Sequence, residues 1–215
     1  MQTSLCIPGY PLYNVELATM LIIQNTACYV NHFDLSHFEH LAVGIVSDTH
    51  GHLDTAVRDR LHGCDLILHA GDIGASHVLH QLRDICPVVI PVRGNNDCTG
   101  KWPQQDHPEL AVIGDTAKVE LPGGSIALTH GDRFNPPSSR HEKLRRYFAG
   151  TTAIVYGHSH ELVCDQEVLP WVLNPGAAGK ARTKGGASCL LVSAGRHQWK
   201  VSKFRSSNPS PGKSR

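Results

Sequence analysis

The segment Val43-Gly44-Ile45-Val46-Ser47-Asp48-Thr49-His50 joins a short apolar run to two side chains that can bind a metal ion. A run of this length that is rich in β-branched residues is typical of a buried strand. Asp48 and His50 stand two positions apart where the strand is predicted to end. Because alternate residues of an extended chain point to the same side, both side chains can reach one ion.

Four further segments repeat this arrangement of an apolar run followed by oxygen or nitrogen donors. The apolar runs are Leu66-Ile67-Leu68, Val88-Val89-Ile90, Ile126-Ala127-Leu128 and Ala153-Ile154-Val155-Tyr156. The donor segments that follow them are Gly71-Asp72, Gly94-Asn95-Asn96-Asp97, Thr129-His130-Gly131-Asp132 and Gly157-His158-Ser159-His160. Asp, Asn and His are ligands that divalent cations of intermediate softness accept, and an α/β sheet places its ligand site beyond the carboxyl ends of its strands. The five segments together therefore predict a metal centre, although a single Asp-x-His would more often be structural.

The donor set suits two ions rather than one. His158 and His160 repeat the spacing of the first pair, and the carboxylate of Asp72 has two oxygens that can bridge two ions. Asn95 offers an amide oxygen and His130 a further imidazole. Two ions about 3.5–4 Å apart can bind a hydroxide between them and clamp a phosphate for in-line attack. The spacing thus indicates a dinuclear hydrolytic site.

The predicted elements alternate at first and then change character. Helical patterns over 54–62 and 75–85 follow the first two strands, which indicates parallel strands joined by right-handed crossovers. Residues 97–110 are polar and contain two prolines, so we expect a loop there. Further along we expect a hairpin of 116–121 and 125–129 around Pro122-Gly123-Gly124, a helix from Ser138 or Ser139 to Phe148, and mostly antiparallel strands near 152–156, 161–168, 170–174, 187–193 and 197–204. This order predicts two β layers enclosed by helices.

The chain divides into three parts by composition. Residues 1–40 contain three acids and no Lys or Arg, and their apolar residues show no clear periodicity. We expect them to form a poorly ordered N-terminal extension, so that a chain beginning near Leu41 should fold and act normally. Residues 41–205 form the predicted domain, and 206–215, rich in Ser, Pro and Gly, form a predicted disordered basic tail.

Composition and charge exclude several classes of protein. The net charge of +1 gives no electrostatic reason to expect nucleic acid as a partner. Seven scattered cysteines without a Cys-x-x-Cys motif favour reduced thiols and a cytoplasmic location. The apolar stretch 17–23 is much shorter than the roughly 20 residues that a membrane-spanning helix needs, so no membrane partner is expected.

The order Asp-x-His, Gly-Asp, Gly-Asn-x-Asp, His and Gly-His-x-His, with the turn Asn174-Pro175-Gly176 after it, resembles the calcineurin-like metallophosphoesterases. The resemblance covers about Leu41 to Arg205 and is greatest to the small bacterial and archaeal phosphodiesterases of that superfamily. It implies an α/β fold, a four-layer αββα sandwich in which helices flank two mixed β-sheets. It also implies two divalent metal ions, with manganese expected first and iron, nickel or zinc as alternatives.

The resemblance also assigns roles to individual residues. One ion would take Asp48, His50, Asp72 and His160, and the other would take Asp72, Asn95, His130 and His158. Asp72, Asn95 and His130 are the residues of this set that we expect to take part in catalysis.

Two positions depart from the family pattern. Asn96 stands where many members have a histidine that is thought to protonate the leaving group, and Asn cannot act as a general acid. Ala177 stands where the family turn usually has Ser. The resemblance therefore leaves open which residue, if any, assists the departing oxygen.

The expected function is a metal-dependent phosphodiesterase that hydrolyses small-molecule phosphodiesters with a hydroxide bridging two divalent metal ions. The alternatives are a phosphomonoesterase, or a catalytically weak scaffold protein of the same fold, as in a retromer subunit. Because all seven ligand positions carry competent residues, the enzyme is favoured. Whether the protein forms a homo-oligomer stays open.

Six other residues carry weaker signals. We expect Asp97 to hold the Asn95 loop by bonds to the backbone, Arg93 and Arg182 to form ion pairs or face solvent, and His52 to be a solvated loop residue. His69 is either a hydrogen-bonded strand-end residue or a neighbour of the metals, and Cys98 lacks an activating partner.

Overall fold

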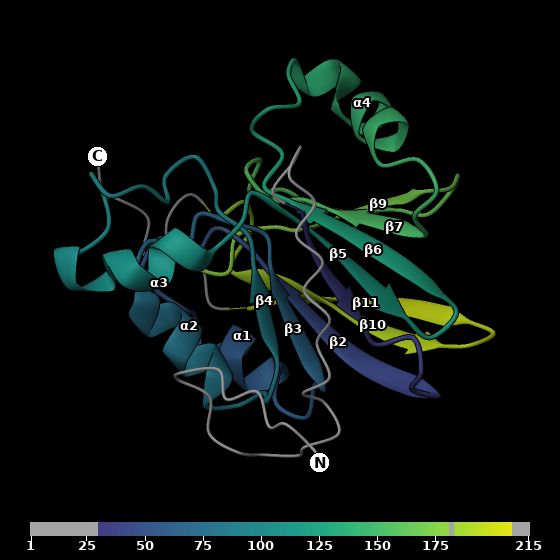
Figure 1. Ribbon diagram of the computed structural model, residues 1–215, viewed down its shortest axis with the longest axis horizontal. Helices are drawn as coiled ribbons and strands as arrows, with labels where there is room; N and C mark the ends of the chain where they lie inside the picture. Colours follow the sequence, from purple (N-terminus) through teal and green to yellow (C-terminus); the bar gives the residue numbers. More distant parts are fainter. Residues whose placement is uncertain (1–29, 181–182, 208–215) are drawn as a thin grey trace, which may run out of the picture.

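The computed structural model describes residues 30–180 and 183–207, which form two β-sheets packed face to face with helices on both outer sides (Figure 1). The six-stranded sheet has the order β1–β5–β6–β7–β9–β8, and the five-stranded sheet has the order β11–β10–β2–β3–β4. Both sheets are mixed, since each contains parallel and antiparallel pairs. The four-layer αββα sandwich expected from the sequence is therefore confirmed.

The bounds of the elements are as follows. In the six-stranded sheet they are β1 Val30–Asp34, β5 Thr116–Leu121, β6 Gly124–Thr129, β7 Ala153–Val155, β9 Trp171–Pro175 and β8 Leu162–Asp165. In the five-stranded sheet they are β11 Trp199–Arg205, β10 Ser188–Gly195, β2 His40–Val46, β3 Leu66–His69 and β4 Val89–Pro91. The helices are α1 Thr55–Arg60, α2 Ser76–Arg83, α3 His107–Val112 and α4 Arg140–Tyr147, with short 3-10 helices at Gln104–Asp106 and Pro137–Ser139.

The main core lies between the two sheets and follows from the alternation of the strands. Val43 and Ile45 of β2 point inward to meet Leu128 of β6 and Val155 of β7, and all four are completely buried. The opposite faces of both sheets are covered by helices (Figure 1). A second cluster contains Val57, Leu61, Leu79 and Leu82 of α1, α2 and their ends, and a third contains Leu144 of α4. The strands are thereby held rigidly on both faces.

Most predicted elements are present, with ends shifted by a few residues. Asp54 caps α1 as expected, because its Oδ1 accepts hydrogen bonds from the backbone N–H groups of Ala56 at 3.0 Å and Val57 at 3.2 Å. The predicted hairpin is formed by β5 and β6. The predicted loop over 97–110 is wrong in part, since it contains the first 3-10 helix and most of α3. Pro108 does not prevent this helix because it stands in the first turn, where no backbone donor is needed.

The pairing of β7 also differs from the expected antiparallel arrangement. It lies parallel to both β6 and β9. The segment between β6 and β7 crosses over through α4, and such a crossover returns the chain in the same direction. The pairs β8–β9 and β10–β11 are antiparallel as expected.

The part of the predicted extension that the structure describes, residues 30–40, is integral to the fold. β1 pairs in parallel with β5, from Val30 opposite Thr116 to Asp34 opposite Glu120. Phe33 and Leu35 are buried in the core between the sheets. The expected domain boundary at residue 41 is therefore too late. Residues 1–29 of the predicted extension and 208–215 of the predicted tail lie outside the described residues.

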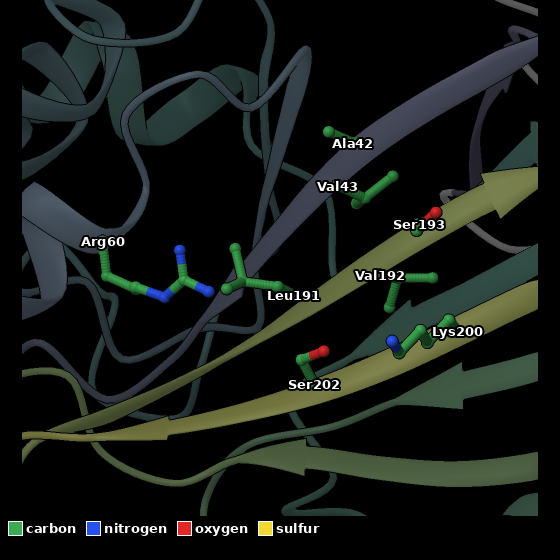
Figure 2. A pocket seen from close by; sticks show the side chains of 8 residues that line it. All are labelled: Ala42, Val43, Arg60, Leu191, Val192, Ser193, Lys200 and Ser202. Carbon is green, nitrogen blue, oxygen red and sulfur yellow. The ribbon is translucent and has the colours of Figure 1, made fainter.

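A shallow hollow of about 170 Å³ lies where β2, β10 and β11 run past α1 (Figure 2). Its lining includes Arg60 and Lys200 beside Leu191. It borders Ala42 and Val43 at the start of β2, whereas the predicted ligands follow the end of that strand. The hollow is therefore separate from the candidate metal site.

Candidate metal centre

The seven predicted ligands all follow the carboxyl ends of strands, and the structure brings them to one edge of the sandwich. Asp48 and His50 follow β2, Asp72 follows β3, and Asn95 follows β4. His130 follows β6, and His158 and His160 follow β7. Both sheets therefore contribute side chains to the same site.

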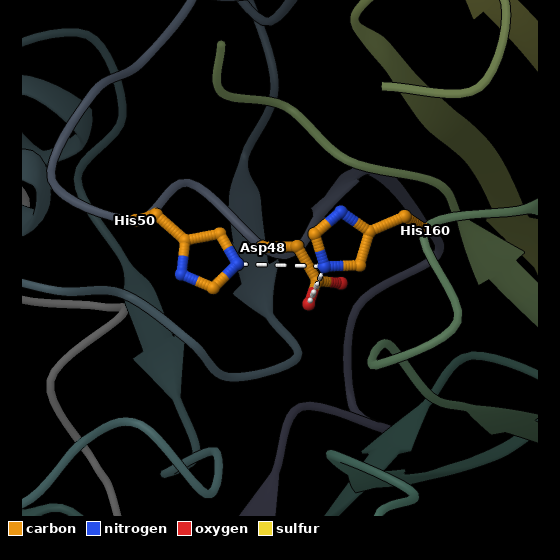
Figure 3. Close-up of side chains that lie close together, drawn as sticks. All are labelled: Asp48, His50 and His160. Atoms are coloured by element: carbon orange, nitrogen blue, oxygen red, sulfur yellow. Dashed lines mark hydrogen bonds and ion pairs between the residues drawn. The ribbon is translucent and has the colours of Figure 1, made fainter. Parts of the chain in front are cut away.

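A first group consists of Asp48, His50 and His160, whose ligand atoms lie within 4.8 Å of one another. Asp48 Oδ1 is 3.2 Å from His160 Nε2, which is in turn 3.4 Å from His50 Nε2 (Figure 3). Figure 3 shows the two rings turned toward each other above the carboxylate. This arrangement of two imidazole nitrogens and a carboxylate oxygen can hold one cation.

A second group consists of Asp48, Asp72 and His130, again with ligand atoms within 4.8 Å. His130 Nδ1 lies 2.8 Å from the carbonyl oxygen of Ala70, so that nitrogen carries the proton and donates it. Nε2 is then directed at Asp72 Oδ2, 3.4 Å away. A carbonyl that fixes the tautomer in this way is the usual support of a metal-binding histidine.

Asp72 belongs to the second group and also lies near a histidine of the first. Its Oδ2 is 3.7 Å from His50 Nε2 and 3.4 Å from His130 Nε2, and its side chain is only 2% exposed. Asp48, rather than Asp72, is the residue that belongs to both groups, which the spacing did not predict. Burial raises the pKa of Asp72, but His130 and the hydrogen bonds from Asn96 outweigh it and hold this pKa well below its usual range.

The charge of the site favours a cation. Burial lowers the pKa of His130, but the carboxylates of Asp72 and Asp48 outweigh this effect and raise it to about 9. Two buried carboxylates thus draw positive charge to the neighbouring imidazole of His130. A divalent cation would satisfy the same demand.

His158 and Asn95 stand at the more exposed side of the site. His158 Nδ1 is 3.2 Å from Asn95 Oδ1, and the ring of His158 lies edge-on to that of His130 with centroids 5.2 Å apart. His158 does not join either compact group. The backbone of His158 does contact a member of both groups, because its N–H donates to Asp48 Oδ2 at 3.0 Å.

The backbone at the ligands is in an uncommon conformation. Within 30–180 and 183–207, positive φ angles at non-glycine residues occur at Asp48, His50, Asp72, His158 and His160. All five are predicted ligands, with φ between 46° and 65°. A non-glycine residue in the left-handed region costs of the order of 1–3 kcal/mol and persists where the surroundings impose it. Here the N–H of Asp48 bonds to Gly71 O and that of His50 to Asp72 O, each at 2.9 Å.

Two buried polar atoms of the site have no hydrogen-bond partner among the described residues. They are Asp48 Oδ1 and His130 Nε2. Leaving a buried polar atom without a partner costs about 1–3 kcal/mol of folding free energy. Both atoms belong to ligand groups of the candidate site. Together with the donor chemistry, these atoms show that the residues present fit a bound divalent cation.

Glycines allow the loops to approach one another closely. A Cβ on Gly94 would lie 2.3 Å from Asp72 Oδ1, and one on Gly157 would lie 1.9 Å from Ser47 Oγ. Neither position has room for a side chain. The glycines of the donor segments thus set the spacing of the ligands.

Asp97 supports the site without reaching the ligand groups. Its carboxylate accepts hydrogen bonds from the backbone N–H groups of Gly94 at 2.8 Å, Gly74 at 3.0 Å and Ile73 at 3.1 Å, and from Trp102 Nε1 at 2.9 Å. The expectation that Asp97 holds the loop of Asn95 by bonds to the backbone is confirmed. Asp97 also ties this loop to the turn after Asp72.

His69 is a hydrogen-bonded residue beneath the site. Its Nδ1 accepts from the N–H of Gly71 at 3.2 Å, so Nε2 carries the proton and donates to Thr49 Oγ1 at 2.9 Å. Thr49 in turn donates to Ile73 O. Burial lowers the pKa of His69 to about 4, which keeps the ring neutral. Of the two readings of His69, the hydrogen-bonded one fits the structure.

The remaining candidates have different outcomes. Arg93 forms an ion pair with Asp115 at 2.8 Å, as expected. Cys98 is an exposed free thiol, and His52 is half-buried. Arg182 lies outside the described residues.

Sequence reasoning predicted the turn after the last ligand and the helix α4, but it did not predict that this helix contacts the residue before the last ligand segment. Asn174 Nδ2 donates to Gly157 O at 2.8 Å and holds the loop of His158 and His160. On the other side of this loop, the hydroxyl of Tyr156 meets His141 Nε2 of α4 at 3.0 Å. Tyr156 directly precedes the Gly-His-Ser-His segment, and that position was the only signal for its role.

Comparison with known proteins agrees with this fold. The model of the calcineurin-like phosphoesterase superfamily domain matches residues 41–196, and the chain therefore belongs to that superfamily. A probable metallophosphoesterase of Methanocaldococcus jannaschii is 30% identical over 144 residues, which cover 64% of this chain and 68% of the relative. A phosphodiesterase of the same archaeon is 27% identical over 147 residues, covering 63% of this chain and 83% of the relative.

Solved structures with the same fold include proteins of two kinds. A single mutant of Vps29 from Entamoeba histolytica has a TM-score of 0.66 at 20% identity, covering 79% of this chain and 95% of that one. A novel archaeal phosphodiesterase has a TM-score of 0.57 at 22% identity, covering 76% of this chain and all of the other. No helix within 30–180 and 183–207 is long and apolar enough to cross a bilayer.

Proposed function

We propose that this protein is a metal-dependent phosphodiesterase that hydrolyses small-molecule phosphodiesters at a dinuclear centre. The observation that carries the proposal is the convergence of seven oxygen and nitrogen donors, five of them on left-handed backbone, at one edge of the sandwich. Membership of the superfamily and the resemblance to an archaeal phosphodiesterase support it.

Asp48, His50, Asp72 and His160 would hold one ion, and Asp72, Asn95, His130 and His158 the other. Manganese is the first candidate, with iron, nickel or zinc as alternatives. Two divalent cations, when bound, would supply an activated water molecule as the nucleophile and offset the charge of the phosphate.

The chain's own residues prepare this site before any substrate binds. Asp72 and Asp48 provide two buried negative charges between the imidazoles. Ala70 O fixes the tautomer of His130, and Asn174 and Asp97 hold the loops that carry the other ligands. Asn95 and His158, on the exposed side, are placed to meet a phosphate as it enters. Preorganisation of this kind lowers the cost of reaching the transition state.

The alternatives are a phosphomonoesterase and a scaffold protein of the same fold. The likeness to Vps29 shows that the two proteins share a fold. At 20% identity, this likeness does not support a shared function. The complete ligand set favours the enzyme over the scaffold.

The test is a comparison of aryl and alkyl phosphodiesters with the matching monoesters. The purified full chain would be assayed after chelation and again after addition of Mn²⁺. We expect diester hydrolysis that chelation removes and Mn²⁺ restores. Preference for monoesters would favour the phosphomonoesterase, and metal binding without turnover of any ester would favour the scaffold.

A further inference from the structure

A lysine lies at the solvent side of the candidate centre, one side chain away from the carboxylate between the ligand groups. The ammonium of Lys101 donates to Asn96 Oδ1. The amide of Asn96 donates through Nδ2 to Asp72 Oδ2 at 2.6 Å, and its backbone N–H donates to Asp72 Oδ1 at 2.9 Å. Lys101 is exposed, Asn96 half-buried and Asp72 buried, so this series of contacts runs inward from solvent.

The turn that carries Lys101 is well anchored. The N–H groups of Lys101 and Trp102 donate to Cys98 O at 2.9 and 3.0 Å. The indole of Trp102, only 4% exposed, donates to Asp97, which also holds the Gly94 loop. The backbone at Lys101 is thus held, through its neighbour Trp102, by Asp97, which also holds the loop of Asn95 and Asn96.

The charge of Lys101 is not neutralised by a carboxylate. Within the described part of the chain, no ion pair forms at its ammonium, whereas Lys118 pairs with Glu120 and Lys184 with Glu161. A positive charge held by a neutral amide beside a phosphate site is available to an anionic group of the substrate.

The burial of the ligands indicates which substrate atom Lys101 would meet. Asp48, Asp72 and His130 are each at most 2% exposed and form the floor of the site. A nucleophile formed beside these buried side chains would approach phosphorus from the buried side of the site. Because in-line displacement expels the leaving oxygen on the opposite side, the leaving oxygen faces solvent, where Lys101 and Asn96 lie.

We propose that Lys101 is a catalytic residue whose ammonium donates a hydrogen bond to the departing oxygen, with Asn96 as its positioning residue. A water molecule loses a proton to solvent, and the oxygen of the resulting hydroxide bonds to phosphorus while the ester P–O bond breaks, with the electron pair of that bond staying on the departing oxygen. This oxygen leaves as an alkoxide or phenolate stabilised by Lys101 and takes its proton from water. The inference rests on the proposed diester hydrolysis.

The experiment measures turnover of a series of phosphodiesters with leaving groups of graded pKa by the full chain, Lys101→Gln and Lys101→Arg, all loaded with Mn²⁺. We expect Lys101→Gln to lose up to about 100-fold on the poorest leaving group and little on the best, which steepens the dependence on leaving-group pKa. Lys101→Arg, which keeps a donor and a charge, should lie between. Lys118→Gln on β5 is the matched control and should change nothing.

Calorimetric titration with Mn²⁺ supplies a readout that does not depend on turnover, and Lys101→Gln should bind Mn²⁺ as the wild type does. An equal loss on every ester, an unchanged dependence on leaving-group pKa, or weakened Mn²⁺ binding by Lys101→Gln would each overturn the role of Lys101 while leaving the proposed function in place. Absence of metal-dependent diester hydrolysis in the wild type would overturn both.

Discussion

The carboxylate of Asp72 contacts three residues of the site, His50, His130 and Asn96. Its Oδ2 faces His50 and His130, and both of its oxygens accept hydrogen bonds from Asn96. The residue is buried and its backbone is left-handed, a conformation that Asp and Asn tolerate better than most residues. Asp72 thus combines a charge, a position between two histidines and a demanding backbone geometry.

Replacing Asp72 by Asn keeps the shape and the backbone tolerance but removes the charge between the two histidines. We expect at least about a 100-fold loss of Mn²⁺ affinity, since loss of a mere supporting contact already costs about 10–100-fold, together with loss of diester hydrolysis. Calorimetry and a diester assay measure the two effects. Asp59→Asn, at an exposed position of α1, should match the wild type. Near-normal turnover of Asp72→Asn at saturating Mn²⁺ would contradict the bridging role.

Asp97 should matter for stability as well as for the site. Asp97→Ala would leave three backbone N–H groups and the Trp102 indole without their acceptor. We expect unfolding in urea to show a loss of about 3 kcal/mol or more, since buried donors without partners cost about 1–3 kcal/mol each and water can reach some of them. Asp97→Asn, which keeps part of the acceptor capacity, should lose less. Equal stability of Asp97→Ala and the wild type would show that the loop is held by other contacts.

At the scale of elements, β1 is the strand that composition alone could not reveal. The strand is short and its polar residues, Asn31, His32 and Asp34, do not alternate with apolar ones. Its buried apolar contacts are those of Phe33 and of Leu35 just beyond its end. Its register is set by β5, more than eighty residues away in the chain. Non-local pairing of this kind leaves no periodic signal in a five-residue segment.

The two possible N-terminal truncations should therefore behave differently. Removing residues 1–29 keeps β1 and should leave the melting temperature of the described domain largely unchanged. Removing residues 1–40 exposes the core beneath Phe33 and Leu35, and each buried apolar side chain of this size contributes about 1.5–3 kcal/mol. Thermal melts of the two shortened chains decide the matter. Equal melting temperatures would restore the boundary expected at residue 41.

The ligand loops, by contrast, were predictable from the chain because each follows a local signal. A β-branched run marks the strand, and a glycine with a polar neighbour marks its end, as in Gly71-Asp72. The chemistry of the donors then selects the site. The contacts of Lys101 with Asn96 and of His141 with Tyr156 depend on how loops and helices pack, and no spacing in the sequence encodes them.

At the scale of the molecule, the metal centre should contribute to stability. Buried Asp48 and Asp72 lie in one group with His130, and a bound divalent cation would offset their charge more fully than the protonated ring does. A ligand at 100 times its dissociation constant stabilises the folded state by about 2.7 kcal/mol. We expect Mn²⁺ to raise the melting temperature and a chelator to lower it. The same titration with Asp72→Asn should give a much smaller rise, and an equal rise would place the ion elsewhere.

The ligands come from strands of both sheets, and this has a consequence for how the sandwich opens. Where β2 and β3 of one sheet meet β6 and β7 of the other, a shared ion would join the two layers at that edge. The opposite edge is held by side-chain packing and by contacts such as the hydrogen bond from Trp199 Nε1 to Pro122 O at 2.7 Å. Amide hydrogen exchange should then become graded along each strand once metal is added. Protection would rise most near Val46, His69, Thr129 and Val155 and least at the far ends of the same strands, so that separation of the layers begins at the edge away from the ion.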